Sequence, residues 1–98
     1  MDEKTNILIV DDDESTRRSL RLILGKKGYE TQEAGTGREA IEKAQEAGFD
    51  VALLDIRLPD MGGVDLIKPL REKRPDMAVI MITGYASLET AVQALDAG

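Results

Sequence analysis

The chain has 98 residues, a net charge of −6 and 42% hydrophobic residues, a composition typical of one small domain with a real core. Because it contains no Cys and no His, disulfides, thiolate or imidazole metal sites and a histidine base are excluded. The negative charge argues against binding of nucleic acid or an anionic membrane by this segment itself. Since the sequence has no membrane-spanning apolar run and no signal peptide, we expect a cytoplasmic domain.

Short apolar runs alternate with amphipathic segments along the whole chain. The expected strands are residues 6–10, 29–34, 49–55 and 77–83. The expected helices are residues 14–27, 38–47, 64–74 and 88–97. This alternation predicts a single α/β domain over residues 1–98, with a parallel sheet, right-handed crossovers and helices on both faces.

The faces of these elements can also be predicted. In the first helix, Leu20, Ile23 and Leu24 form the apolar stripe that is expected to face the core. Arg17 on the same helix is expected to point mostly outward. The second strand is the most polar of the four and therefore belongs near an edge of the sheet. In the third helix, Pro69 costs up to about 3 kcal/mol unless it lies in the first turns.

Acidic residues follow the ends of two buried strands. Asp11, Asp12 and Asp13 come directly after the first strand, Asp55 ends the third, and Thr83 ends the fourth. Parallel strands open onto a crevice at their carboxyl ends, so Asp11, Asp12 and Asp55 predict one acidic pocket there. Neighbouring carboxylates share a proton or hold a cation, most simply Mg²⁺. For Asp13 we favour a simpler role at the positive N-terminus of the first helix.

Three segments of this sequence resemble the receiver domain of two-component response regulators. They are ILIVDDD at 7–13, VALLDIRLPDMGG at 51–63 and VIMITG at 79–84. The resemblance covers essentially the whole chain in order and implies a doubly wound, flavodoxin-like sheet with strand order 2-1-3-4. Residues 83–92 are also similar to receivers of enhancer-binding transcription activators.

The resemblance implies a role for each matching residue. Asp55 would accept a phosphoryl group from the phosphohistidine of a sensor histidine kinase, in a Mg²⁺-dependent reaction. The Mg²⁺ ligands would be Asp12, Asp55 and the backbone carbonyl of Arg57, with Asp11 acting mostly through water. Thr83 would be the switch hydroxyl. The chain would then be a phosphoacceptor and not an enzyme, and it would control a transcriptional output domain that binds DNA in the parent protein.

The chain departs from the family pattern at two places. Met61-Gly62-Gly63 stands where Met-Asp-Gly is usual, so the loop after Asp55 lacks one acid. A full receiver continues into a fifth strand, with a lysine and an aromatic switch residue, and a fifth helix. Because these are missing, we expect a truncated receiver whose phosphorylation couples poorly to conformational change. We also expect the open apolar edge of residues 77–82 to pair with another copy, giving a homodimer or larger assembly.

Parts of the sequence also suggest three other functions. A D-x-D-x-S sequence starting at Asp11 imitates the nucleophile motif of haloacid-dehalogenase phosphatases, but the chain is too short for that fold. A G-x-G-x-x-A sequence starting at Gly35 opens a helix as in nucleotide-binding modules, although the strand before it is too polar for a central Rossmann strand. A fragment that does not switch and has a structural or assembly role is the third alternative.

Overall fold

The computed structural model describes residues 5–55 and 58–82, along which strands and helices alternate. The strands are β1 (Asn6–Val10), β2 (Glu30–Ala34), β3 (Val51–Asp55) and β4 (Ala78–Ile82). The helices are α1 (Glu14–Lys26), α2 (Gly37–Glu46) and α3 (Gly63–Lys73). The helix predicted at 88–97 lies outside the described residues.

Strands β2 and β4 each begin one residue later than predicted because local turns take up the residue before them. The Tyr29 amide donates to the Leu24 carbonyl at 3.1 Å, and Gly28 has a φ of 92°, so α1 ends in a turn that includes Tyr29. The Met77 amide donates to the Arg74 carbonyl at 3.1 Å in the same way. Every described element otherwise matches its prediction to within two residues.

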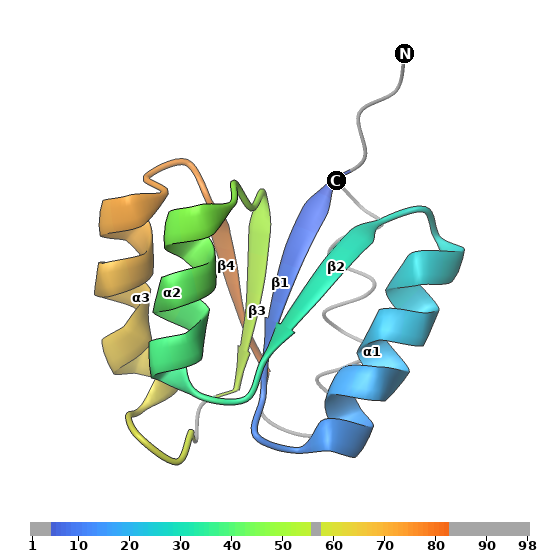
Figure 1. Ribbon diagram of the computed structural model, residues 1–98, viewed down its shortest axis with the longest axis horizontal. Helices are drawn as coiled ribbons and strands as arrows, with labels where there is room; N and C mark the ends of the chain where they lie inside the picture. The colour runs from blue at the N-terminus through green and yellow to red at the C-terminus, as the bar shows by residue number, and fades with distance from the viewer. Residues whose placement is uncertain (1–4, 56–57, 83–98) are drawn as a thin grey trace.

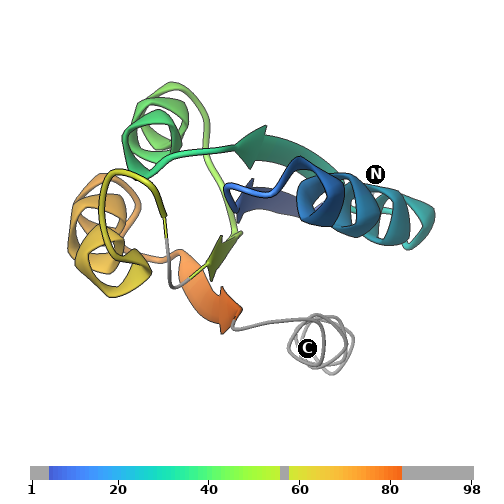
Figure 2. The same cartoon turned by 90° about the horizontal axis from the view of Figure 1, so that it is seen from below.

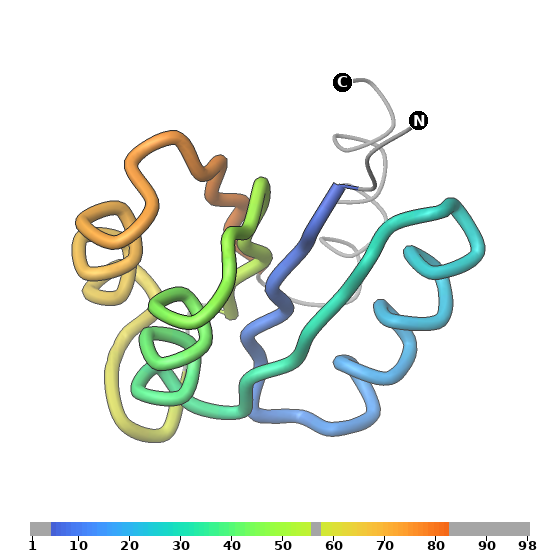
Figure 3. Tube along the Cα trace, turned by 45° about the horizontal axis from the view of Figure 1, so that its top comes forward, coloured from blue at the N-terminus to red at the C-terminus, as the bar shows by residue number. Residues whose placement is uncertain are grey.

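The sheet is parallel, with strand order β2-β1-β3-β4. Helix α1 covers one face, and α2 and α3 cover the other (Figure 1 and Figure 2). The predicted doubly wound architecture and strand order are therefore confirmed. The loops that leave β1 and β2 lie at the same end of the sheet, as the trace in Figure 3 shows.

Side chains of the strands alternate between two apolar layers, as the pleat requires. The layer under α1 contains Ile7, Ile9, Leu20, Leu24, Val51, Leu53 and Ile82. The layer under α2 and α3 contains Leu8, Val10, Ala34, Ala40, Ala44, Phe49, Ala52, Leu54, Leu66, Leu70 and Met77. Strand β1 is buried on both faces, because Ile7 through Val10 are all fully inaccessible.

Two predictions about α1 were wrong. Leu20 and Leu24 are fully buried, but Ile23 is 41% exposed. At 3.6 residues per turn, Ile23 lies about 100° around the helix from Leu24, whereas Arg17 lies only about 20° from Leu24. Arg17 therefore points toward the sheet, and its side chain is 19% exposed instead of extending outward.

The sheet edges and Pro69 can be compared with the sequence directly. The polar strand β2 lies at one edge, as predicted, and alternates between exposed and half-buried residues up to the buried Ala34. Pro69 lies inside α3, beyond its first turn, so its missing N–H removes one helical hydrogen bond.

Within the described residues, β4 pairs with β3 alone. None of the helices in the described part of the chain is long and apolar enough to cross a membrane.

Candidate functional site

Strand pairing brings the predicted acidic residues together. Asp11 follows β1 and Asp55 ends β3, and these two strands are parallel neighbours with Val10 opposite Leu54. Carboxylate oxygens of Asp11, Asp12 and Asp55 all lie within 4.8 Å of one another. We call these three residues the acidic cluster. Asp11 is buried, Asp55 is half-buried and Asp12 is exposed, so the cluster opens to solvent on the side of Asp12.

Hydrogen bonds to two neighbouring segments hold Asp11 in place within the cluster. Its amide donates to the Ala34 carbonyl at 3.1 Å, and its Oδ1 accepts from the Asp13 amide at 2.9 Å. The pKa of Asp11 is raised from 3.8 to about 6, mainly by burial and to a smaller extent by the charges of Asp55 and Asp12, against the lowering effect of the Asp13 amide. A cation in the cluster would relieve this repulsion and favour the ionised carboxylate.

Asp13 lies outside the acidic cluster and caps α1. Its Oδ2 accepts from the Thr16 hydroxyl at 2.6 Å and from the Thr16 amide at 3.2 Å. These bonds, above all the one from the hydroxyl, lower the pKa of the Asp13 carboxyl. The predicted role of Asp13 at the helix N-terminus is therefore confirmed.

The segment before α3 is docked on the N-terminus of α2. The Asp60 carboxylate accepts from the amides of Gly37 at 2.8 Å and Arg38 at 3.0 Å, and the Gly37 bond is the main cause of the lowered pKa of Asp60. Met61 packs against Gly37 so closely that a Cβ there would lie 2.6 Å from the Met61 sulfur. Sequence analysis missed this contact. An acid suits a helix N-terminus, but nothing local identifies a partner helix 23 residues away.

The docking of Asp60 also bears on the nucleotide-binding alternative. A nucleotide phosphate would need the amides at the N-terminus of α2, where the glycine sequence begins. The Gly37 and Arg38 amides already donate to Asp60, and the Glu39 amide donates to the Thr36 hydroxyl at 3.1 Å. The glycines therefore serve close packing and capping within the protein.

Two predicted site residues, Arg57 and Thr83, lie outside the described residues. Their assigned roles, a backbone carbonyl ligand and a switch hydroxyl, stay predictions. In the β3–β4 ladder Asp55 stands opposite Ile82, the residue that precedes Thr83 in the sequence.

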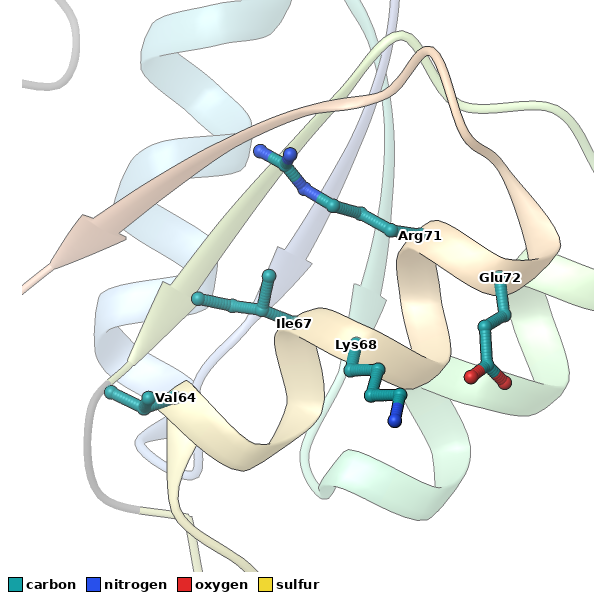
Figure 4. A pocket seen from close by; sticks show the side chains of 5 residues that line it. All are labelled: Val64, Ile67, Lys68, Arg71 and Glu72. Atoms are coloured by element: carbon teal, nitrogen blue, oxygen red, sulfur yellow. The ribbon is translucent and has the colours of Figure 1, made fainter.

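Two surface hollows lie away from the acidic cluster. One, of about 550 Å³, follows α3, and Figure 4 shows Ile67 and Arg71 extending from that helix on the side of β4. The other, of about 350 Å³, lies where β3 and β4 begin. The described residues that line these hollows do not include Asp11, Asp12 or Asp55.

The donor set of the acidic cluster fits a hard divalent cation. All three side chains offer carboxylate oxygens, the ligands that Mg²⁺ and Ca²⁺ prefer, and the cluster contains no nitrogen or sulfur ligand that would favour zinc or copper. Mg²⁺ is commonly bound by one or two carboxylates together with waters and phosphate oxygens.

Residues 7–98 match the family model of the response regulator receiver domain. The chain belongs to this family. The match includes both strand ends that carry the acidic cluster, and it confirms the resemblance that the sequence motifs indicated. Receiver domains are signalling modules of two-component systems, which places this domain in that class.

Individual receiver proteins show the same similarity. Response regulator protein PilR of Pseudomonas aeruginosa is 44% identical over 91 residues, which are 93% of this chain and 20% of PilR. Transcriptional regulatory protein ZraR of Klebsiella oxytoca is 40% identical over 96 residues, 98% of this chain and 22% of ZraR. The chain thus spans about a fifth of the length of these curated relatives.

Solved structures agree with the fold. A response regulator receiver domain protein from Methanospirillum hungatei is 46% identical with a TM-score of 0.81, covering 98% of this chain and 77% of that one. A response regulator from Burkholderia pseudomallei is 36% identical with a TM-score of 0.79, covering 97% of this chain and 56% of that one. The crystal structure of the latter contains a phosphorylated aspartic acid, a calcium ion and citrate.

Proposed function

We propose that Asp55 is the phosphoacceptor of this receiver domain and that the acidic cluster binds Mg²⁺ for the transfer. The observation that carries the proposal is the convergence of Asp11, Asp12 and Asp55 within 4.8 Å at one end of the sheet. A related response regulator with a phosphorylated aspartic acid and a divalent cation supports it. The donor would be the phosphohistidine of a sensor histidine kinase.

The transfer needs little from the protein besides placement of the nucleophile. A carboxylate oxygen of Asp55 attacks phosphorus, the phosphorus–nitrogen bond of the donor breaks, and its electron pair stays on the imidazole nitrogen. The product is an acyl phosphate on Asp55. Because each molecule takes up one phosphoryl group, the domain acts as a phosphoacceptor and not as a turnover enzyme.

The chain's own residues would divide the work around Asp55. Asp12, on the exposed side, and Asp55 would bind the cation directly together with the Arg57 carbonyl, while buried Asp11 would act mostly through water. When bound, Mg²⁺ supplies positive charge that offsets the repulsion between carboxylates and phosphoryl oxygens. The Thr83 hydroxyl would turn toward the phosphoryl group and report its presence.

The wider role extends this proposal to the parent protein. We place the receiver in the cytoplasm, where a sensor kinase can phosphorylate it. Its output would be transcriptional, as the name of the relative ZraR suggests, with DNA bound by another domain. Self-association through the edge of β4 is part of the proposal and is tested separately below.

Phosphorylation can be tested with a small donor. The chain is incubated with acetyl phosphate and Mg²⁺, and its intact mass is measured for the wild type, Asp55→Asn and Asp76→Asn. Asp76 is an exposed aspartate near the start of β4, at the other end of the sheet, and serves as a matched control. We expect one phosphoryl adduct in the wild type and in Asp76→Asn, and none in Asp55→Asn or with EDTA. An adduct of equal yield in Asp55→Asn would refute the assignment.

A further inference from the structure

The backbone carbonyl of Asp11 needs a hydrogen-bond donor from outside the sheet. The last paired residues of β1 and β2 are Val10 and Ala34, so the chain leaves the ladder at Asp11. The residue is only 6% exposed, and a buried carbonyl without a partner is costly. The loop that carries Asp11 and Asp12 therefore depends on a side chain that reaches back to it.

Arg17 of α1 supplies that donor. Its Nη1 donates to the Asp11 carbonyl oxygen at 2.6 Å, and its Nε donates to Glu33 Oε1 at 3.2 Å. The guanidinium thus bridges the end of β1 and the end of β2. Hydrogen bonds from a cation are stronger than neutral ones, and the planar fork of arginine can serve two acceptors in fixed directions.

The surroundings of Arg17 keep it in this position. Glu33 is held from its other oxygen by Arg21, whose Nη1 lies 3.0 Å from Oε2. A Cβ on Gly35 would lie 3.3 Å from Arg17 Nη1, so the absence of a side chain there leaves the space that the guanidinium uses. Three segments, the start of α1 and the ends of β1 and β2, therefore converge on one side chain.

We propose that Arg17 is a positioning residue for the phosphoryl site. Arg17 binds the carbonyl of Asp11, while the amide of Asp11 donates to the Ala34 carbonyl. With its backbone held on both sides, Asp11 directs its carboxylate toward Asp12 and Asp55. The inference rests on the proposed function, because only a site that binds a cation needs three carboxylates held together. Arg17 bonds to the Asp11 backbone and to Glu33, and it acts on the site through Asp11.

Mutual repulsion is the reason that such a device is needed. Two like charges stand beside Asp11, so without a restraint on its backbone its carboxylate would turn away from the cluster toward solvent. The hydrogen bond from the Asp13 amide to Asp11 Oδ1, at 2.9 Å, reports whether the carboxylate is in place. This bond can be followed without any metal ion.

The experiment compares Arg17→Met with Arg21→Met in the full chain. Both variants remove one positive charge from α1 and one ion pair to Glu33, but only Arg17→Met also removes the hydrogen bond from Arg17 to the Asp11 carbonyl. Magnesium chloride is titrated by calorimetry to obtain the Mg²⁺ Kd. Hydrogen exchange of the Asp13 amide is measured by NMR in EDTA, below the melting temperature of each variant.

We expect the Mg²⁺ Kd to rise on the order of 10-fold in Arg17→Met, as for other residues that orient metal ligands, with faster exchange of the Asp13 amide. Arg21→Met should change the Kd by no more than about twofold, because an exposed charge is screened. An equal rise in both variants, or an unchanged Asp13 amide in Arg17→Met, would overturn the proposal.

Two further outcomes keep the inference separate from the function on which it rests. In one, the wild type binds no Mg²⁺ while the Asp13 amide exchanges faster in Arg17→Met than in the wild type. In that case the proposed function fails and the positioning of Asp11 by Arg17 stands. If Arg17→Met does not fold, Arg17→Lys is measured in its place. A single ammonium cannot reproduce the fork, so a raised Kd is expected, and wild-type values for both readouts would overturn the proposal.

Discussion

Replacing Asp11 by Asn should stabilise the chain at neutral pH in the absence of divalent cations. Asp11 is 6% exposed and stands beside Asp12 and Asp55, so its negative charge is unfavourable in the folded state. An Asn side chain has nearly the same shape and can still accept the hydrogen bond from the Asp13 amide. The substitution removes the charge and keeps the contact.

The magnitude follows from the pKa of Asp11, which is 3.8 as the ordinary value and about 6 in the folded protein. Between these values the folded state binds more protons than the unfolded state, so the contribution of Asp11 to the free energy of unfolding falls as pH rises. The fall is complete above about pH 6. Two pKa units correspond to about 3 kcal/mol, which is the upper bound on the gain from Asp11→Asn at pH 7.5.

Urea unfolding followed by circular dichroism in EDTA gives this gain directly. Wild type and Asp11→Asn are compared at pH 4.0 and pH 7.5, and the other titrating groups cancel in the difference. We expect a difference of up to about 3 kcal/mol at pH 7.5 and little at pH 4.0. A difference that is the same at both pH values would show that the buried charge of Asp11 is not its source.

Four further outcomes are expected. Gly37→Ala should lower the free energy of unfolding by about 1–3 kcal/mol in urea titrations, because the new methyl group meets Met61. Adding Met61→Ala to this variant should restore part of the loss, and additive losses from the two substitutions would contradict the proposed clash. Gly62→Ser should raise the melting temperature, since Gly62 caps α3 without a side-chain bond, and a lower value would exclude capping. Leu66→Ala should cost about 2–5 kcal/mol, and a loss below 1 kcal/mol would mean that the core layer can collapse around it. Light scattering at high micromolar concentration should show a dimer or larger species, paired through the β4 edge, whereas a monodisperse monomer would refute that pairing.

Much of the fold and the acidic cluster could be predicted because their signals are local. An apolar run that is buried on both faces and ends in acids, as at Val10 and Asp11, is sufficient to place β1 in the centre of the sheet. The same pattern at Asp55 places a second acid at the same end of a parallel sheet. Their convergence then follows from topology alone, without any knowledge of side-chain contacts.

The contacts that hold this site could not be predicted, because they join residues far apart in sequence. Arg17 resembles any basic residue on an exposed helix face until the rotation of α1 over the sheet is known. The same rotation exposes Ile23, although its spacing from Leu20 fits an apolar stripe. Asp60 meets the amides of α2 only after α3 has packed beside that helix.

The central claim is that Asp55 becomes an acyl phosphate. It is tested most directly by treating the chain with acetyl phosphate and Mg²⁺, reducing it with borohydride, and sequencing its peptides by mass spectrometry. Borohydride converts an aspartyl phosphate to homoserine, so the modified position is marked permanently. The account predicts homoserine at position 55 that depends on both acetyl phosphate and Mg²⁺. Homoserine at Asp11, Asp12 or another aspartate, with position 55 unchanged, would contradict it.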